Sequence, residues 1–198
     1  MSGANTLPSD AGIADVRGID PRHLIWAAVA LIAMVIVIQS DNLWTLNFMH
    51  VMCGVLWTGI DLFMGFVVGP IMRRLPPQAR RAVILRLMPK MLFLLPTLSI
   101  ITGTTGWFHA RALGFLDLPW PQYGWVLAAL IIVGILTVQG LGVLLPTNLL
   151  VYFEMRKPIP DGARIGRLMK RYFRVSAAGW LFVPAEVCSA LVEEISRK

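Results

Sequence analysis

Five long apolar stretches constrain this chain more than any other feature of its sequence. They cover residues 24–39, 43–72, 88–109, 124–152 and 172–192. A helix needs about 20 mostly apolar residues to cross the hydrocarbon core of a bilayer. The composition agrees, because 57% of the residues are hydrophobic and 15% are charged, whereas soluble domains carry about 25% charged residues. We therefore expect an all-α membrane bundle of five transmembrane helices. Residues 22–198 would form this single domain, after a disordered cytoplasmic tail over residues 1–21.

The basic residues predict how this bundle lies in the membrane. Of the 18 Lys and Arg residues, 15 fall in the tail and in the connections 73–90 and 156–174, all on one side of a five-span bundle. Loops rich in Lys and Arg stay in the cytoplasm. We expect a multi-pass protein of the cytoplasmic (inner) membrane, with the N-terminus inside and the C-terminus outside. The net charge of +7 is thus explained by the lipid bilayer as partner and not by nucleic acid. Asp161 is expected to cap a short basic helix before the fifth span.

The second span carries polar and small residues along one face. His50 and Asp61 are 11 residues apart, so at about 100° per residue they share a side of the helix. Gly54, Trp57 and Gly65 lie on the same stripe. Because such a mixture is unsuited to lipid contact, the stripe is expected to face the interior of the bundle.

Two histidines are candidate ligands near the outer surface. An imidazole at His50 could bind haem or a metal, or carry protons; alternatively, it hydrogen-bonds to a neighbouring helix. His109 ends the third span at a similar depth and could complete a haem or copper site with His50. Otherwise His109 lies among the headgroups, and Met91 or no protein group is the second axial ligand.

Two acids lie near the middle of the predicted membrane. Asp61 is in the second span and Glu186 in the fifth, with no Lys or Arg at that depth. Ionisable residues within spans mark proton or ion pathways by default. The two acids are therefore candidates for a proton relay. The alternative is that each is a structural acid, hydrogen-bonded near Gln139 or Trp180.

Other catalytic classes have no signal in this sequence. There is no phosphate-binding loop, nucleophile elbow or dinucleotide-binding glycine pattern. The two cysteines, Cys53 and Cys188, lie in apolar stretches and form no Cys-x-x-Cys motif. Neither a hydrolase nor a nucleotide-dependent enzyme is indicated.

The second span resembles the first conserved helix of the copper-resistance D-like superfamily, which includes the HemJ-type membrane protoporphyrinogen oxidases. The resemblance is carried by His50, by Trp57-x-Gly59, and by the basic exit after Pro70. The pair Thr102-Gly103 is similar to the Thr-Gly of the next helix in that family. The resemblance implies a helical bundle with His50 as a haem ligand. HemJ-type proteins also use a lysine in the following helix, whereas here the nearest lysine is Lys90, at the start of that span. This difference does not favour protoporphyrinogen oxidation.

Together, the histidines and acids favour a membrane protein that binds haem b and takes part in electron transfer or membrane redox chemistry. His50, Gly54, Trp57 and His109 would bind the haem. The alternatives are a transporter of copper or a small solute, in which His50 and His109 would hold the metal, and a structural subunit of a membrane complex. A redox partner or a second copy of the chain would be the protein partner.

Overall fold

The computed structural model describes residues 22–157, 159–172 and 174–175, and all regular structure in these residues is helical. Residues 162–172 form a helix after the last labelled element. The labelled elements are α2 (Arg22–Gln39), α3 (Leu43–Phe63), η1 (Met64–Val68), α4 (Gly69–Arg74), α5 (Pro77–Ala112), η2 (Phe115–Asp117), α6 (Tyr123–Gln139), η3 (Gly140–Leu144) and α7 (Leu145–Arg156).

Four helical rods in this part of the chain are long and apolar enough to cross a membrane. They are Arg22–Gln39, Leu43–Arg74, Pro77–Ala112 and Tyr123–Arg156. The prediction of an all-α, membrane-type fold is confirmed. Most of the predicted fifth span, 172–192, and the predicted tail, 1–21, lie outside the described residues.

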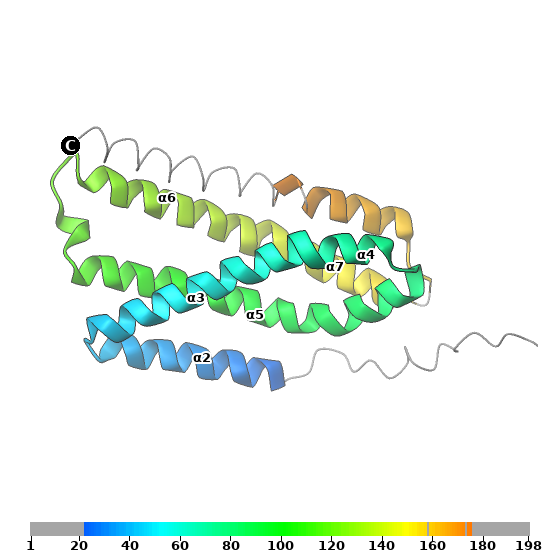
Figure 1. Ribbon diagram of the computed structural model, residues 1–198, viewed down its shortest axis with the longest axis horizontal. Coiled ribbons are helices and arrows are strands. Elements are labelled where there is room, and N and C mark those ends of the chain that lie inside the picture. The colour runs from blue at the N-terminus through cyan, green and yellow to red at the C-terminus, as the bar shows by residue number, and fades with distance from the viewer. Residues whose placement is uncertain (1–21, 158, 173, 176–198) are drawn as a thin grey trace, which may run out of the picture.

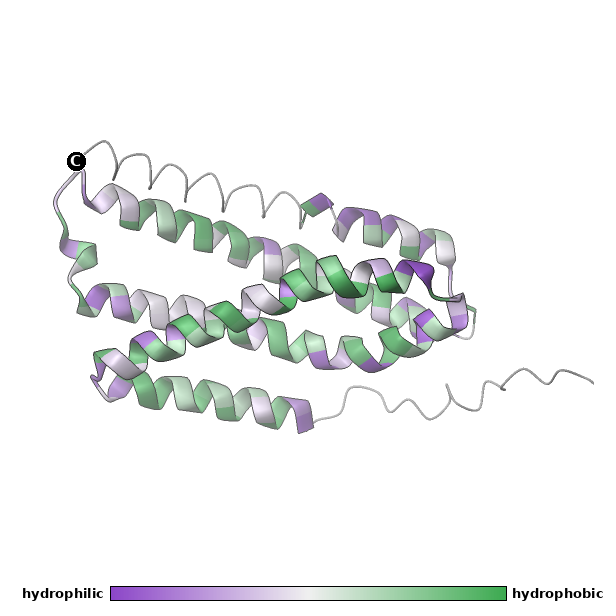
Figure 2. Ribbon diagram, viewed as in Figure 1, coloured by the Kyte–Doolittle hydropathy of each residue, from purple (hydrophilic) through white to green (hydrophobic). Residues whose placement is uncertain are grey.

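The rods run antiparallel, and α5 is the central one (Figure 1). It contacts α2, α3 and α7. A tight turn joins α2 to α3, where the Asn42 side chain accepts a hydrogen bond from the Thr45 amide at 3.1 Å and caps α3. Apolar residues dominate the middle of the rods, and hydrophilic residues gather at their ends (Figure 2). This pattern is the one that a bilayer requires.

The start of the third rod differs from the sequence prediction. Residues 73–90 were expected to form a basic connection, but α5 already begins at Pro77, so the connection after α4 consists of Leu75 and Pro76. Proline is well suited to the first helical position because its missing N–H has no partner there. At about 1.5 Å per residue, the 36 residues of α5 extend over about 54 Å, well beyond a hydrocarbon core of about 30 Å. The first turns of α5 therefore have room to carry Arg80, Arg81 and Arg86.

Two rods contain a π-helical turn directly before a proline. In η1, the amide of Gly69 donates to the carbonyl of Met64, and Pro70 follows. In η3, the amide of Leu145 donates to the carbonyl of Gly140, and Pro146 follows. A proline ring clashes with the carbonyl four residues earlier in an α-helix, and a local π adjustment accommodates it. These π turns were not predicted from the sequence.

The largest buried cluster lies at the end of the bundle where α5, α7 and the helix 162–172 meet; we call this the basic end. Its core is Leu85, Val151, Tyr152 and Met155, with side chains from 162–172 packed against it. Arg81 donates from Nε to the carbonyl of Met155 at 2.9 Å and from Nη2 to that of Lys157 at 2.7 Å. These bonds satisfy carbonyls that the end of a helix leaves without partners.

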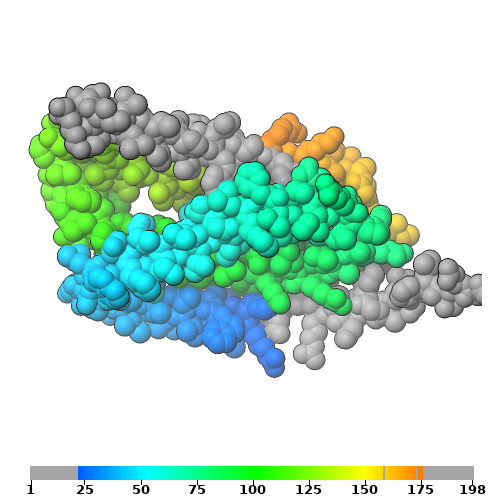
Figure 3. All heavy atoms as spheres, viewed as in Figure 1, coloured from blue at the N-terminus to red at the C-terminus, as the bar shows by residue number. Residues whose placement is uncertain are grey.

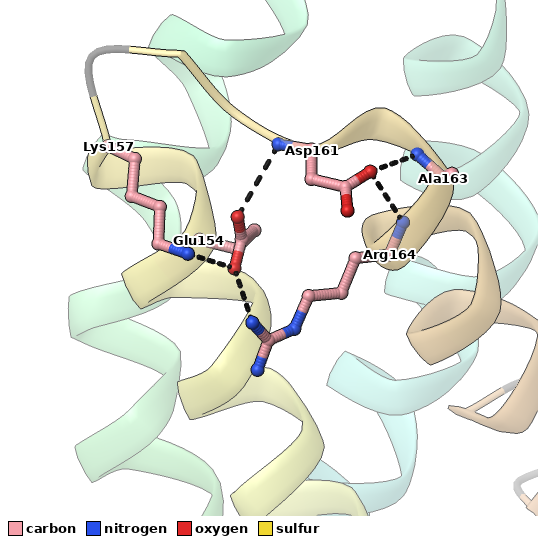
Figure 4. Close-up of polar contacts among 5 residues, drawn as sticks. All are labelled: Glu154, Lys157, Asp161, Ala163 and Arg164. Atoms are coloured by element: carbon pink, nitrogen blue, oxygen red, sulfur yellow. Dashed lines mark hydrogen bonds and ion pairs between the residues drawn. The ribbon is translucent and has the colours of Figure 1, made fainter.

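A polar network joins α7 to the helix 162–172 at the basic end (Figure 4). The Glu154 carboxylate, whose residue is only 4% exposed, pairs with Lys157 at 2.8 Å and with Arg164 at 3.3 Å. The Asp161 carboxylate accepts hydrogen bonds from the amides of Ala163 at 2.9 Å and Arg164 at 3.0 Å. The prediction that Asp161 caps this helix is confirmed.

We expect Asp161→Ala to loosen the helix 162–172 at neutral pH, and Asp161→Asn to preserve it because Asn also accepts at an N-cap. The pKa of Asp161 is lowered, mainly by the Arg164 amide, then by the Ala163 amide and by the charges of Arg167 and Arg164. The stabilisation from the charged cap is therefore fully present above the ordinary pKa of 3.8 and is lost as the pH falls through the lower folded value.

Hydrogen exchange of the amides of Ala163 and Arg164 measures this effect. Exchange should be faster in Asp161→Ala than in the wild type at pH 7, once both rates are corrected for intrinsic exchange. The difference should narrow below the ordinary pKa of an aspartate. Equal protection of both amides at pH 7 would show that the cap does not hold the helix.

Candidate functional site

The predicted polar stripe of the second span faces the bundle interior from His50 to Asp61. His50 Nδ1 lies 2.9 Å from the carbonyl oxygen of Thr102 on α5. One turn further along α3, a Cβ added at Gly54 would lie 3.4 Å from the Thr102 side chain. Trp57 and Asp61 then line a cavity that α3 shares with α5, η3 and α7. Among the described residues nothing lies within 4 Å of a Cβ placed at Gly65, so the observed contacts of the stripe end at Asp61. The change of helical phase at the π turn η1 explains the end of the stripe.

His50 is wedged against the backbone of α5. A Cβ added at Gly106 would lie 2.6 Å from Cε1 of the imidazole, closer than real Cβ contacts come. Only a glycine at this position lets the ring approach. Because a carbonyl oxygen can only accept, Nδ1 carries the proton of the neutral ring and Nε2 keeps its lone pair. Of the two alternatives for His50, the hydrogen bond to a neighbouring helix is observed, and Nε2 has no hydrogen-bond partner within the described residues.

His109 lies on the same side of α5 as the residues that receive His50. It is seven residues after Thr102, which is two turns at nearly the same angle, and three residues after Gly106. His50 and His109 share no hydrogen bond in the described part of the chain. The Thr102 hydroxyl is buried there without a hydrogen-bond partner. The structure therefore brings His50 onto Thr102 and places His109 beyond it without joining the two rings.

Besides the surroundings of His50, the candidate site contains a cavity of about 170 Å³ beside Asp61. Its walls are mostly apolar, with side chains such as Met91, Leu92 and Leu95 from α5. Polar side chains reach it from α3, α5, α6, α7 and the helix 162–172; they are Thr58, Asp61, Ser99, Thr137, Gln139, Asn148 and Tyr172. Specific sites for small molecules have this composition: an apolar wall with a few convergent polar groups.

Asp61 is the only acidic residue among the described residues that line this cavity, and no Lys, Arg or His from them lines it. An ionised carboxylate in apolar surroundings needs a positive charge or several donors to compensate it. Gln139, considered from the sequence as a neighbour of the acids, does line the same cavity. Glu186, the other predicted relay acid, lies outside the described residues. His50 does not line this cavity. The two ends of the predicted stripe therefore lie in different surroundings, His50 against the backbone of α5 and Asp61 at the cavity.

The sequence prediction missed five polar residues of this cavity: Thr58, Ser99, Thr137, Asn148 and Tyr172. Ser99 and Asn148 lie inside predicted spans, where any hydrogen-bonding side chain is unusual, and that was the available signal. Tyr172 stands at the start of the predicted fifth span and lies beside Asn148 and Asp61. Only the packing of the helix 162–172 on α7 shows that it reaches the cavity.

No family model, curated protein or solved structure matches this chain. Among the described residues, no three His, Cys, Asp or Glu side chains form a group that could hold a metal ion. The site is therefore interpreted from its own geometry.

Proposed function

We propose that this protein is a membrane carrier that binds a small solute and a proton in turn at Asp61. The observation that carries the proposal is the cavity between α3, α5, α6, η3 and α7, where Asp61 is the one carboxyl among the described lining residues and most of the wall is apolar. Intramembrane acids that face a cavity mark the routes of ions and protons. One carboxyl holds either a proton or another positively charged group, so a single site of this kind couples the two.

The donor set of the cavity fits this proposal better than copper transport. Its polar atoms are oxygens and amides, with Met91 as the one sulfur side chain among the lining residues. Copper(I) prefers thiolate and thioether ligands. Cys53 lies on α3 outside the lining of this cavity. We therefore propose a small solute, and not copper, as the ligand.

Cysteine accessibility tests whether the cavity is reached from water. In a Cys53→Ser, Cys188→Ser background, Ser99→Cys would place a thiol in the cavity and Ile100→Cys would place one on the lipid-facing side of α5, where Ile100 is 40% exposed. Only an ionised thiol reacts, and lipid disfavours ionisation. A water-soluble trimethylammonium methanethiosulfonate should therefore modify Ser99→Cys at least about tenfold faster.

Asp61→Asn extends the same experiment. The substitution keeps the size of the side chain but removes its charge, so it should slow the cationic reagent at Ser99→Cys without slowing a neutral one. If Ser99→Cys and Ile100→Cys react equally slowly, the cavity is closed to water and the proposed carrier function fails.

We further propose five spans in the cytoplasmic membrane, with the basic end in the cytoplasm. The two largest groups of Lys and Arg, in 73–90 and 156–174, support this orientation. A reporter inserted at Gln78 should then be cytoplasmic and one fused after Lys198 should be outside. Reporters on the same side would contradict the five-span arrangement.

Haem b binding is a second candidate function, and His50 supports it. A ligating histidine commonly donates its other ring nitrogen to a backbone carbonyl, and His50 does so to Thr102. The space-filling view also shows an opening between α3 and α6 (Figure 3). His50 would hold the haem, Gly54 and Trp57 would border it, and a bound haem would supply one-electron transfer. Haem binding at His50 is also what the resemblance to the copper-resistance D-like superfamily implies.

A reduced-minus-oxidised spectrum tests the haem proposal. Protein expressed with sufficient haem should show a b-type spectrum that His50→Ala abolishes. His109→Ala should change the spectrum only if both histidines are axial ligands. Colourless wild-type protein would contradict haem binding and leave the carrier proposal intact.

A further inference from the structure

The class of solute that fits the cavity follows from the pairing of Asp61 with Trp57. These residues are four positions apart on α3 and both line the cavity, so their Cβ atoms are about 5–6 Å apart on one face of the helix. A carboxylate and an indole side by side attract a cation in two ways. The carboxylate supplies the opposite charge, and the aromatic face binds alkylammonium groups by a cation–π interaction.

We propose that the cavity binds a small alkylated organic cation, of the size of tetramethylammonium, between Asp61 and Trp57. This inference rests on the proposed carrier function and names the class of its solute. An anion is disfavoured because no cationic side chain among the described residues lines the cavity. A neutral solute would leave the proton of Asp61 in place, so it could not exchange with that proton as the proposed carrier requires.

The walls distinguish an organic cation from a metal ion. A metal cation must exchange its hydration shell for several oxygen ligands. Among the described lining residues Asp61 is the only charged oxygen ligand, and no three His, Cys, Asp or Glu side chains of the described residues form a group that could hold a metal ion. Seven of the 17 described lining residues are Leu or Met, whose side chains contact alkyl groups well and offer a metal ion no oxygen ligand.

The volume sets an upper limit on the cation. Pockets for drug-sized ligands occupy about 300–1,000 Å³, whereas this one has about 170 Å³. Tetramethylammonium should therefore bind and tetrabutylammonium should not, although both carry the same charge.

Equilibrium dialysis of labelled tetramethylammonium against the purified full chain tests the inference. The chain is placed in phosphatidylcholine nanodiscs, whose lipid has no net charge. Asp61→Asn should weaken binding about thirtyfold or more, as truncating a buried charge pair does. Trp57→Leu should weaken it about 2- to 30-fold, with a smaller loss for Trp57→Phe, which keeps a ring. Trp44→Leu is the matched control, because Trp44 is on the same helix but 73% exposed and outside the cavity lining.

The comparison of tetramethylammonium with tetrabutylammonium uses the wild type alone, so it tests the inference even if a variant fails to fold. Equal affinity for tetramethylammonium and tetrabutylammonium would overturn the inference, and so would unchanged binding in Asp61→Asn. Binding of sodium without any binding of tetramethylammonium would overturn it but leave the carrier function standing. If no cation binds and Ser99→Cys does not react, the carrier function itself fails.

Discussion

Gly106→Ala should destabilise the protein by about 1–3 kcal/mol, as overpacking does, whereas Gly103→Ala should be nearly neutral. The added methyl at Gly106 would meet the His50 ring at 2.6 Å from Cε1, with the backbone of α5 behind it. A methyl at Gly103 would meet only Val133, at 4.0 Å. The two glycines are on the same helix one turn apart, so helix propensity changes equally in both variants.

The expected mechanism is displacement of His50. When the ring moves, its hydrogen bond to the Thr102 carbonyl is lost, which removes about 0.5–1.5 kcal/mol more. Unfolding in mixed micelles, followed by helical circular dichroism, measures the free energy. His50→Ala should make Gly106→Ala harmless, because the methyl then fills the vacated space. Additive effects of the two substitutions would show that the ring does not contact Gly106.

Arg81→Ala should lower the free energy of unfolding by about 2–4 kcal/mol, from the loss of two hydrogen bonds donated by a charged group. The substitution would leave the carbonyls of Met155 and Lys157 without these donors. Met155 is part of the buried cluster at the basic end. Arg81→Lys should recover only part of the loss, because an ammonium lacks the fork that reaches two carbonyls.

Arg86→Ala is the matched control for this experiment. Arg86 lies on the same helix, is exposed, and makes no hydrogen bond or ion pair within the described residues. Protease cleavage between α7 and the helix 162–172 provides a local measurement, and it should become faster in Arg81→Ala. Equal unfolding free energies for Arg81→Ala and Arg86→Ala would show that the basic end is held by the apolar cluster alone.

The organisation of the second span shows how far sequence reasoning reached into the site. The spacing of His50, Gly54, Trp57 and Asp61 was sufficient to predict one inward face, because helical geometry fixes the angle between side chains. The sequence did not show that His50 would contact the backbone of α5 while Asp61 opens into a cavity. These contacts depend on how closely α5 approaches each turn of α3, and glycines at 54 and 106 set that distance only once the helices are paired.

The sequence by itself determined the long apolar rods and the cap at Asp161, because hydropathy and capping act along the chain over a few turns. Tertiary structure decided the rest. It extended α5 back to Pro77, introduced π turns before Pro70 and Pro146, and brought Ser99, Asn148 and Tyr172 to the cavity of Asp61. Residues from separate helices converge only through packing, and no pattern within one helix encodes which residue of another helix will lie opposite.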